Sequence, residues 1–220
     1  MFNFVKLPEL DFDLESITTE FGRTYITPNG NRYPSVTTIL SSYSKDGITE
    51  WREKIGEEEA NKISTQAARR GTSIHKMAER YILNEENIYD KEMPVNIESF
   101  KPIKEILDKH VDNIFGIELP LYNRGLKCAG RTDLVAEFDG TLSIIDFKTS
   151  RKLKKAEWIE SYFLQSTCYA MMFEWIYKIA VPQIVIIITV DNEKTPQVFK
   201  LERSQYVNRV LEIFREDLLL

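Results

Sequence analysis

The sequence predicts an α/β fold in which a mixed central β-sheet is flanked by helices and carries an N-terminal helical elaboration. Three observations predict it. Two runs of strand-forming residues, 132–138 and 141–147, are joined by an Asp-Gly dipeptide that suits a two-residue hairpin turn. Residues 183–190 are a continuous apolar run, typical of a strand covered on both sides. Residues 156–180, which lie between the hairpin and this apolar run, are predicted to be a buried helix. The helix and the strand that follows it then form a crossover unit.

The composition indicates one globular domain with a full core. The chain has 220 residues, of which 43% are hydrophobic and 29% are charged. We expect an N-terminal arm and hairpin (residues 1–47), a helical arch region (48–111), a core that contains the sheet (112–202) and a C-terminal helix (203–220).

Hydropathy, cysteine count and charge limit the function classes. There is no run of about 18 apolar residues, and the N-terminus does not resemble a signal peptide, which predicts a cytoplasmic protein without membrane contact. Cys128 and Cys168 are too few for a zinc knuckle or a four-cysteine iron–sulfur cluster; we expect buried thiols, and a disulfide stays open. The net charge of −5 argues against a protein that coats nucleic acid through its overall field, but it allows a local basic groove.

The N-terminal part is predicted to contain a short hairpin. Residues 1–20 are acidic without a clear period and form an extended arm or a short packed segment. Residues 21–40 predict a strand, a Pro-Asn-Gly turn and a second strand or helix start, with Ser35 as an N-cap. The hairpin either presents basic and stacking groups to a nucleic-acid strand or packs its aromatic rings inward. These groups are Arg23, Tyr25, Arg32 and Tyr33.

A long helical pattern covers residues 48–83 and is broken near Gly56. In its second half His75 and Glu79 lie four residues apart and therefore on one face, with Gly71 one turn earlier. Glycine costs a helix about 1 kcal/mol relative to alanine, so we expect another backbone to approach Gly71 closely. A lone histidine on a helix is usually structural, so the helix pattern alone leaves the role of His75 open.

The middle of the chain leads into the hairpin. Residues 84–97 are acidic and are expected to be a solvated connector, and residues 98–111 have the pattern of an amphipathic helix. Residues 114–122 predict a strand that ends in a turn at residues 123–125. This strand carries Glu118, which the strand pattern alone interprets as a charge at the edge of a strand.

The hairpin is predicted to bring two acidic residues and a lysine together. A two-residue loop pairs Asp133 with Asp146 and brings Arg131 toward Lys148. Because side chains alternate, Asp146 and Lys148 share one face, while Phe147 points to the other. Two carboxylates directly opposite, with Cβ atoms roughly 4.5–5.5 Å apart, are destabilising without a positive charge between them. Mg²⁺ or Mn²⁺ is the natural occupant, because both ions accept carboxylate oxygens as ligands.

Lys148 then stands beside the metal. There its ammonium group can orient or help deprotonate a water and neutralise charge that builds up on a phosphate. The alternative is an exposed hairpin with ordinary surface charges. Both strands are apolar on both faces, so we expect the hairpin to be central in its sheet, where charges at a strand end require a function.

A basic segment follows the second strand of the hairpin. Residues 149–155 contain four cations, a pattern that usually marks a solvated loop. Their position at the mouth of the proposed site favours contact with phosphates. The cations are Arg151, Lys152, Lys154 and Lys155.

The helix at residues 156–180 is apolar on more than one face and is expected to be largely buried. It carries Gln165 and Tyr169 on one face at a four-residue spacing. A buried glutamine needs hydrogen-bond partners, which could be the Lys148 ammonium, a water in the site or a substrate phosphate. The alternative is a core glutamine bonded to the backbone.

The C-terminal end of the chain is predicted to complete the fold. Residues 195–201 have the composition of an edge strand. Ser204 is expected to cap a final amphipathic helix that continues to residue 219.

Two stretches of the hairpin resemble a known nuclease signature. They are Gly130-Arg131-Thr132-Asp133 and Ile145-Asp146-Phe147-Lys148. This pattern is similar to the motif of the PD-(D/E)XK nucleases, in the form used by the RecB-like exonucleases. Thr132 stands in place of the proline in the motif's name, a departure that is common in the family.

Two further motifs support the same resemblance. They are Gly71-x-x-x-His75-x-x-x-Glu79-x-Tyr81 and Gln165-x-x-x-Tyr169. The first resembles the RecB-like motif whose histidine reaches the metal site, and imidazole suits Mn²⁺ better than Mg²⁺; Glu79 is expected to support the helix. The likeness covers about residues 65–190. From residue 33 onward the chain also looks similar to the family of mitochondrial genome maintenance exonucleases and their phage relatives.

The resemblance implies a restriction-endonuclease-like core and a metal-dependent exonuclease. Its substrate would be single-stranded DNA with a free end, threaded under the helical arch during replication, repair or recombination, in the host cytoplasm if a phage encodes it. One or two Mg²⁺ or Mn²⁺ ions, no iron–sulfur cluster, and replication or recombination proteins as partners are implied as well.

The resemblance and the positions in the chain also imply roles for single residues. The implied catalytic residues are His75, Asp133, Asp146, Lys148 and Gln165. The implied metal ligands are His75, Asp133, Asp146 and the Phe147 backbone carbonyl, with Glu118 as an auxiliary acid. The residues expected to contact DNA are Arg69, Arg70, Arg131, Thr149, Ser150, Arg151, Lys152, Lys154 and Tyr169.

Two other functions stay open. The same fold can serve a structure-specific endonuclease. The second alternative is a member of the fold that binds nucleic acid or acts as a scaffold without catalysis. Such members generally lose a carboxylate or the lysine, and this chain keeps them all.

Overall fold

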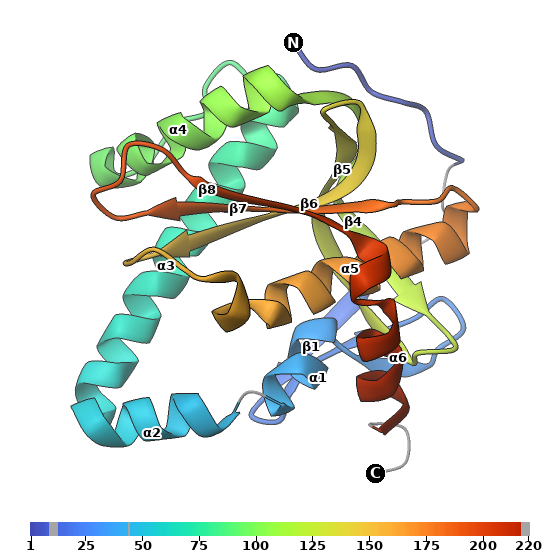
Figure 1. Cartoon of the computed structure of the whole chain (residues 1–220), viewed down its shortest axis with the longest axis horizontal. Helices are drawn as coiled ribbons and strands as arrows, with labels where there is room; N and C mark the ends of the chain where they lie inside the picture. Colours follow the sequence, from blue (N-terminus) through green and yellow to red (C-terminus); the bar gives the residue numbers. More distant parts are fainter. Residues whose placement is uncertain (9–12, 44, 217–220) are drawn as a thin grey trace.

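A five-stranded mixed β-sheet forms the centre of the molecule (Figure 1). Its strands follow in the order β4-β5-β6-β7-β8, in which β6 and β7 are parallel and the other neighbours are antiparallel. Their bounds are β4 (Val111–Asn123), β5 (Cys128–Phe138), β6 (Thr141–Ser150), β7 (Gln183–Val190) and β8 (Gln197–Glu202). The computed structural model describes residues 1–8, 13–43 and 45–216. The predicted α/β class and mixed sheet are confirmed, and the hairpin is central.

The β5–β6 hairpin has the predicted turn and register. Asp139 and Gly140 have φ angles of +50° and +74°, as a type I′ turn requires. The paired ladder runs back from the turn and ends at Leu134 and Ile145. Beyond that pair β5 continues along β4, and β6 continues along β7 to Ser150. The two strands of the hairpin therefore separate before they reach the acidic residues.

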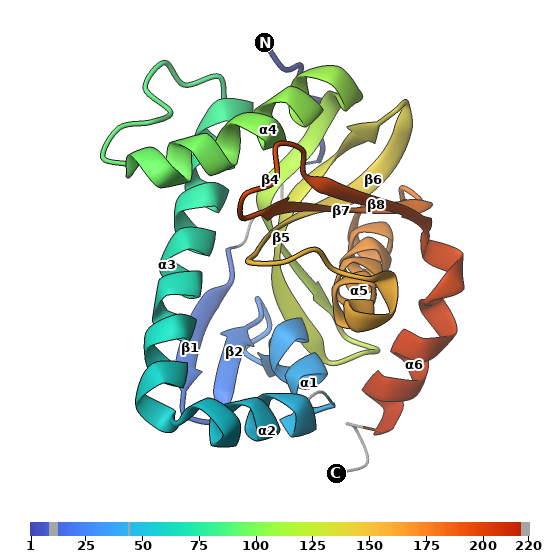
Figure 2. The same ribbon diagram turned by 60° about the vertical axis from the view of Figure 1, so that its left-hand side comes forward.

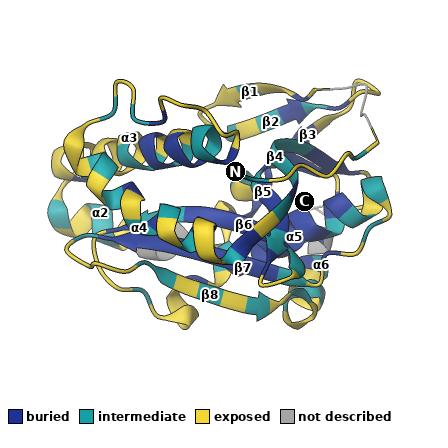
Figure 3. Cartoon of the chain, turned by 90° about the horizontal axis from the view of Figure 1, so that it is seen from above, coloured by how far each residue is buried: buried dark blue, intermediate teal, exposed yellow. Residues whose placement is uncertain are grey.

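Helices cover both faces of this sheet. They are α1 (Val36–Ser42), α3 (Glu57–Ile82), α4 (Pro94–His110), α5 (Glu160–Tyr177) and α6 (Val207–Glu216). Helix α2 (Lys45–Ile55) packs on α3 instead. Ile145 and Phe147 of β6 pack with α3 and α4, whereas Ile144 packs with α1, α5 and α6 on the other face. Figure 3 shows how completely β6 and β7 are buried between these layers. Because side chains alternate along β6, Asp146 and Lys148 share the face of α5.

A second sheet of three strands lies in the N-terminal part. Its strands are β1 (Glu15–Thr19), β2 (Gly22–Ile26) and β3 (Arg32–Pro34). The predicted N-cap is confirmed, because Ser35 Oγ accepts the backbone N–H of Thr38 at 2.9 Å. Tyr25 and Tyr33 are buried beside Leu14, so these two rings pack inward. The strand β1 was not expected, because its hydrogen bonds depend on β2 and not on a local pattern.

Helix α3 begins at the predicted break. Gly56 has a φ of +85° between α2 and α3. Figure 2 shows α3 along one side of the molecule, with α2 turned across its end. The close approach expected at Gly71 is wrong, because no atom lies within 4 Å of a Cβ added there. The helix faces open space at this residue.

Several element boundaries differ from those predicted. Helix α4 begins at Pro94, inside the expected connector, because proline is favoured in the first helical turn. A 3₁₀ turn (Ala156–Trp158) precedes α5. Ser204 lies in a second 3₁₀ turn (Arg203–Gln205) and does not cap α6. The predicted helix end at residue 219 lies outside the described residues.

Two further observations concern the membrane and the cysteines. None of the described helices is both long enough and apolar enough to cross a bilayer. Cys128 of β5 and Cys168 of α5 are buried, with their Sγ atoms 3.7 Å apart, and are not joined as a disulfide.

Candidate active site

The acidic residues of the hairpin lie where β5 and β6 separate. The ladder has ended at Leu134 and Ile145, so Asp133 does not face Asp146 as a strand pair, contrary to the expectation. Instead Asp133 Oδ2 accepts the backbone N–H of Phe147 at 2.9 Å. The Asp133 carboxylate thus satisfies a backbone N–H of β6 that has no partner on β5 in the ladder. The side chains of Asp133 and Asp146 therefore contact different residues.

His75 connects α3 to this point of the sheet. Its Nε2 atom lies 2.7 Å from the Phe147 carbonyl oxygen, and its Nδ1 atom lies 3.6 Å from Asp133 Oδ1. The imidazole ring packs edge-on against the Phe147 ring at a centroid distance of 6.3 Å. The Phe147 backbone is therefore held at two points, by Asp133 at its N–H and by His75 at its carbonyl oxygen.

Asp146 is only 2% exposed and is held by two side chains. Its Oδ1 atom accepts a hydrogen bond from Gln165 Nε2 at 3.0 Å, and its Oδ2 atom forms an ion pair with Lys148. Burial raises the pKa of Asp146 to about 6; Lys148 opposes this rise and Asp133 adds to it. Burial lowers the pKa of Lys148, but Asp146 and Asp133 more than offset that effect. The lysine is therefore held in its ammonium form.

Helix α5 supplies two residues to this ion pair. Gln165 was expected to bond Lys148, a water, a phosphate or the backbone, and its partner is the Asp146 carboxylate instead. Tyr162, one turn earlier, places its ring 5.1 Å from Lys148 Nζ. The sequence analysis missed Tyr162. The signal available was its three-residue spacing from Gln165, which puts both side chains on one helical face.

Glu118 completes a cluster of three potential metal ligands. One ligand atom each from His75, Glu118 and Asp133 lies within 4.8 Å of the others. Glu118 has a φ of +46°, a left-handed conformation that costs a non-glycine residue about 1–3 kcal/mol. Arg131 Nη1 donates to the Glu118 carbonyl at 3.0 Å and stabilises this conformation. Burial raises the pKa of Glu118 to about 7, and the charge of Asp133 adds to the rise.

This set of donors fits a divalent cation. Mg²⁺ and Mn²⁺ accept carboxylate oxygens, and Mn²⁺ also accepts imidazole. Burial, and after it the charge of Asp133, raise the pKa of Glu118, and a bound cation would offset both effects. Asp146 does not belong to this cluster, since its oxygens contact Lys148 and Gln165. The structure thus groups Glu118 with His75 and Asp133, where the hairpin pattern alone favoured Asp146.

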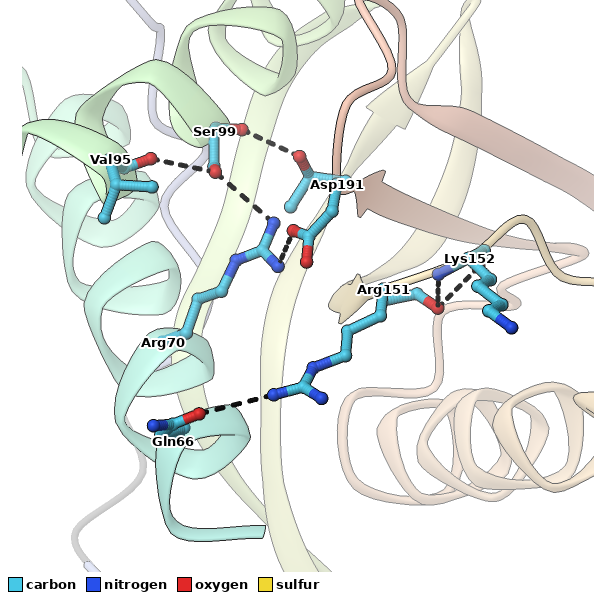
Figure 4. A network of polar contacts seen from close by, with 9 residues as sticks. Gln66, Arg70, Val95, Ser99, Arg151, Lys152 and Asp191 are labelled. Carbon is cyan, nitrogen blue, oxygen red and sulfur yellow. Dashed lines mark hydrogen bonds and ion pairs between the residues drawn. The ribbon is translucent and has the colours of Figure 1, made fainter. Parts of the chain in front are cut away.

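Several residues expected to contact DNA are engaged within the protein (Figure 4). Arg70 of α3 forms an ion pair with Asp191 and donates to Ser99 Oγ at 3.3 Å. Arg151 donates to Gln66 Oε1 at 3.3 Å, which joins the end of β6 to α3. These residues border a cavity of about 780 Å³ between α3, α4 and the carboxyl ends of β6 and β7. Its lining includes Gln66, Arg70, Thr149, Ser150, Arg151 and Asp191.

The remaining predicted DNA contacts differ in exposure. Arg69 and Lys152 are exposed, while the backbone of Lys154 is paired with the Gln197 side chain.

Tyr169 is 4% exposed, so its ring offers no face to a base. It packs against Gly130, where an added Cβ would lie 2.6 Å from the Tyr169 hydroxyl oxygen. The glycine of the motif is therefore needed for close packing of α5 on β5.

Sequence similarity that extends beyond these motifs defines the class of protein. A family model described as the PD-(D/E)XK nuclease superfamily matches residues 77–218, which is more than half of the chain. The chain therefore belongs to the PD-(D/E)XK nuclease superfamily. Its members hydrolyse phosphodiester bonds and generally depend on divalent metals.

Individual relatives are more distant. The mouse (Mus musculus) protein mitochondrial genome maintenance exonuclease 1 is 29% identical over 132 residues, which cover 56% of this chain and 39% of that protein. This chain thus matches well under half the length of that relative. A crystal structure of a Eubacterium rectale protein assigned as an exonuclease is 10% identical, with a TM-score of 0.49, over 68% of this chain and 65% of the other. At that identity and TM-score the likeness says nothing about activity.

Proposed function

We propose that the chain is a metal-dependent exonuclease that removes nucleotides from an end of single-stranded DNA, in replication, repair or recombination. The observation that carries the proposal is the buried Asp146–Lys148 ion pair beside the cluster of His75, Glu118 and Asp133. The similarity to the mouse exonuclease supports action at an end rather than within a strand. Replication or recombination proteins would be its partners.

The cation site belongs to the cluster of His75, Glu118 and Asp133. Asp146 and the Phe147 carbonyl oxygen are further candidate ligands for one or two ions. When bound, Mg²⁺ or Mn²⁺ supplies charge stabilisation at a phosphoryl oxygen and lowers the pKa of a bound water. His75 and Asp133 contact the backbone carbonyl oxygen and N–H of Phe147, so they fix the β6 backbone against α3 at this point.

The other side chains act through their contacts. Lys148, held as an ammonium group by Asp146, neutralises charge on the scissile phosphate and orients the attacking water. Gln165 fixes the Asp146 carboxylate, and Tyr162 borders the ammonium group. Phosphates of the substrate strand would contact the cationic end of β6 and the neighbouring face of α3. The proposed contact residues there are Arg69, Thr149, Ser150, Arg151, Lys152 and Lys154.

The test uses linear single-stranded DNA labelled at either end and circular single-stranded DNA with an internal label. Both are incubated with wild-type protein and with Lys148→Ala in Mg²⁺, in Mn²⁺ and in EDTA. We expect metal-dependent shortening of linear DNA only, and its loss in Lys148→Ala. Lys200→Ala is the matched control, because Lys200 pairs with Asp139 at 2.9 Å beside the hairpin turn, away from the site.

The other outcomes point to the competing functions. Cutting of the circular DNA would replace the exonuclease with an endonuclease of the same fold. Binding without cutting under either metal would leave a non-catalytic nucleic-acid-binding protein. Equal loss of cutting in Lys148→Ala and Lys200→Ala would contradict the special role of Lys148.

A further inference from the structure

An exposed tryptophan lies between the end of β6 and the start of α5. Trp158 is 62% exposed and closes the 3₁₀ turn (Ala156–Trp158). Tryptophan is highly buried on average, because its ring removes a large apolar area from water. Lys155 Nζ lies 5.1 Å from the centre of the Trp158 ring. This ring is held near a cation but is not packed into the core.

The segment that carries Trp158, residues 151–158, is anchored at several points. Ser150 Oγ donates to the Lys152 carbonyl at 2.6 Å. Lys154 and Gln197 exchange two hydrogen bonds, of 2.7 and 2.9 Å, which attach the segment to β8. Ile159, the next residue after the segment, is buried. The exposed ring is therefore presented from a fixed backbone.

A second tryptophan shows what is unusual about Trp158. Trp175 also has a lysine near its ring, since Lys178 Nζ lies 5.5 Å from the ring centre. However, Trp175 is 39% exposed and packs edge-on against Tyr122 at 5.8 Å. No aromatic ring in the described part of the chain packs in that way on Trp158.

A short stretch of chain connects Trp158 to the proposed catalytic centre. Tyr162 follows it by four residues, which span at most about 14 Å of extended chain. The Tyr162 ring lies 5.1 Å from Lys148 Nζ. In Figure 1 the segment runs from the end of β6 to α5, on the face of the sheet that α5 covers. A strand whose phosphate lies at Lys148 can therefore reach Trp158 within a few nucleotides.

We propose that Trp158 stacks on an unpaired base of the substrate strand, while Lys155 and Lys152 contact the neighbouring phosphates. This inference rests on the proposed nuclease function and makes it specific for single strands, because a base in a duplex has both faces covered. Aromatic stacking adds affinity without dependence on sequence, since every base has an aromatic face. The bases, and not the phosphates alone, then help to hold the strand near Lys148.

The test compares three ligands of equal length in EDTA by fluorescence anisotropy. They are a labelled oligothymidylate, an abasic oligonucleotide with the same number of phosphates, and a duplex. Trp158→Ala should weaken binding of the oligothymidylate about 5- to 20-fold and leave abasic and duplex binding unchanged. Trp158→Phe, which keeps an aromatic face, should retain most of the affinity, and Trp175→Ala should behave like wild type.

The outcomes separate this inference from the function on which it rests. Equal affinity of wild type and Trp158→Ala for the oligothymidylate would overturn the stacking role. Equal weakening for the abasic ligand would also overturn it, because the loss would then concern the backbone of the segment or its phosphate contacts. A wild-type protein that binds none of the three ligands would overturn the proposed function as well. Unchanged melting temperatures of the variants verify that they fold.

Discussion

Asp146 is positioned by one amide and one ammonium group. Gln165 donates to one of its oxygens, and Lys148 pairs with the other. Gln165→Ala removes a partner from a buried carboxylate, which can then shift away from Lys148. We expect kcat to fall about 10- to 100-fold, while the affinity for single-stranded DNA in EDTA stays unchanged.

Steady-state kinetics of two variants check this expectation. Gln183→Ala is the control, because Gln183 donates to Ser143 Oγ at 2.8 Å near the hairpin turn and not at the site. Its kcat should match that of wild type. A wild-type kcat in Gln165→Ala would mean that Lys148 alone holds Asp146 in place.

Glu118 makes the metal-free protein sensitive to pH. Its pKa is about 7, above the ordinary value of 4.5, because it is buried beside Asp133. Between these two values the folded protein binds more protons than the unfolded chain, so stability falls as pH rises through this window. We expect the melting temperature in EDTA to fall from about pH 5 to about pH 7.5. The fall should be smaller in Glu118→Gln, which cannot ionise there.

Manganese should reverse that loss. A cation bound by the folded state raises stability by mass action and replaces the proton between the carboxylates. Mn²⁺ should therefore raise the melting temperature of wild type at the higher pH more than that of Glu118→Gln. The control is Glu137→Gln, because Glu137 lies on the same strand as Asp133 and accepts from Asn113 at 2.7 Å. Equal responses of all three proteins would contradict a cation site at Glu118.

At the scale of elements, two glycines occur in opposite backbone conformations. Gly140 in the hairpin turn has a φ of +74°, whereas Gly71 lies within α3, and a Cβ added at either would meet no atom within 4 Å. Alanine in a left-handed turn position costs about 1–2 kcal/mol, but in a helix it gains up to about 1 kcal/mol. We expect Gly140→Ala to lower, and Gly71→Ala to raise, the free energy of unfolding.

Denaturant titration of both variants measures these changes. A destabilised Gly71→Ala would mean that the space beside α3 is filled in solution. Reduced cleavage by a stable Gly71→Ala would mean that the substrate strand approaches the helix at this glycine.

The elements that could be predicted from the sequence are those that depend on neighbouring residues. The turn at Asp139 and Gly140 determines the hairpin register, and Gly56 marks the helix break. The separation of β5 from β6 beyond Leu134 and Ile145 could not be predicted from the sequence. It depends on the pairing of β5 with β4 and of β6 with β7, which are distant contacts. The bond from Gln165 to Asp146 and the left-handed backbone of Glu118 depend on tertiary packing in the same way.

At the scale of the whole molecule, the net charge of −5 means that DNA binding must depend on local cations. Lys152 is exposed on the segment after β6. Each phosphate contact contributes about 0.7 to the slope of log K against log salt for a single strand. We expect Lys152→Ala to weaken binding and to reduce the slope by about 0.7.

Binding measured at several salt concentrations provides the check. Lys91→Ala is the control, because Lys91 is exposed on the connector between α3 and α4. Its slope should equal that of wild type. An unchanged slope in Lys152→Ala would show that Lys152 does not contact a phosphate of the bound strand.

We expect the parts of the site to be brought together at different stages of folding. The two-residue turn pairs β5 with β6 as far as Leu134 and Ile145, and this ladder can form from local contacts. The stretch of β6 that carries Asp146 and Lys148 pairs with β7, which follows later in the chain. His75 comes from a helix much earlier in the chain and arrives only when α3 docks on the sheet. We expect a refolding chain to regain cleavage only in its slowest phase, which sampling activity during refolding would show. A newly made chain would then remain harmless to DNA until its tertiary structure is complete.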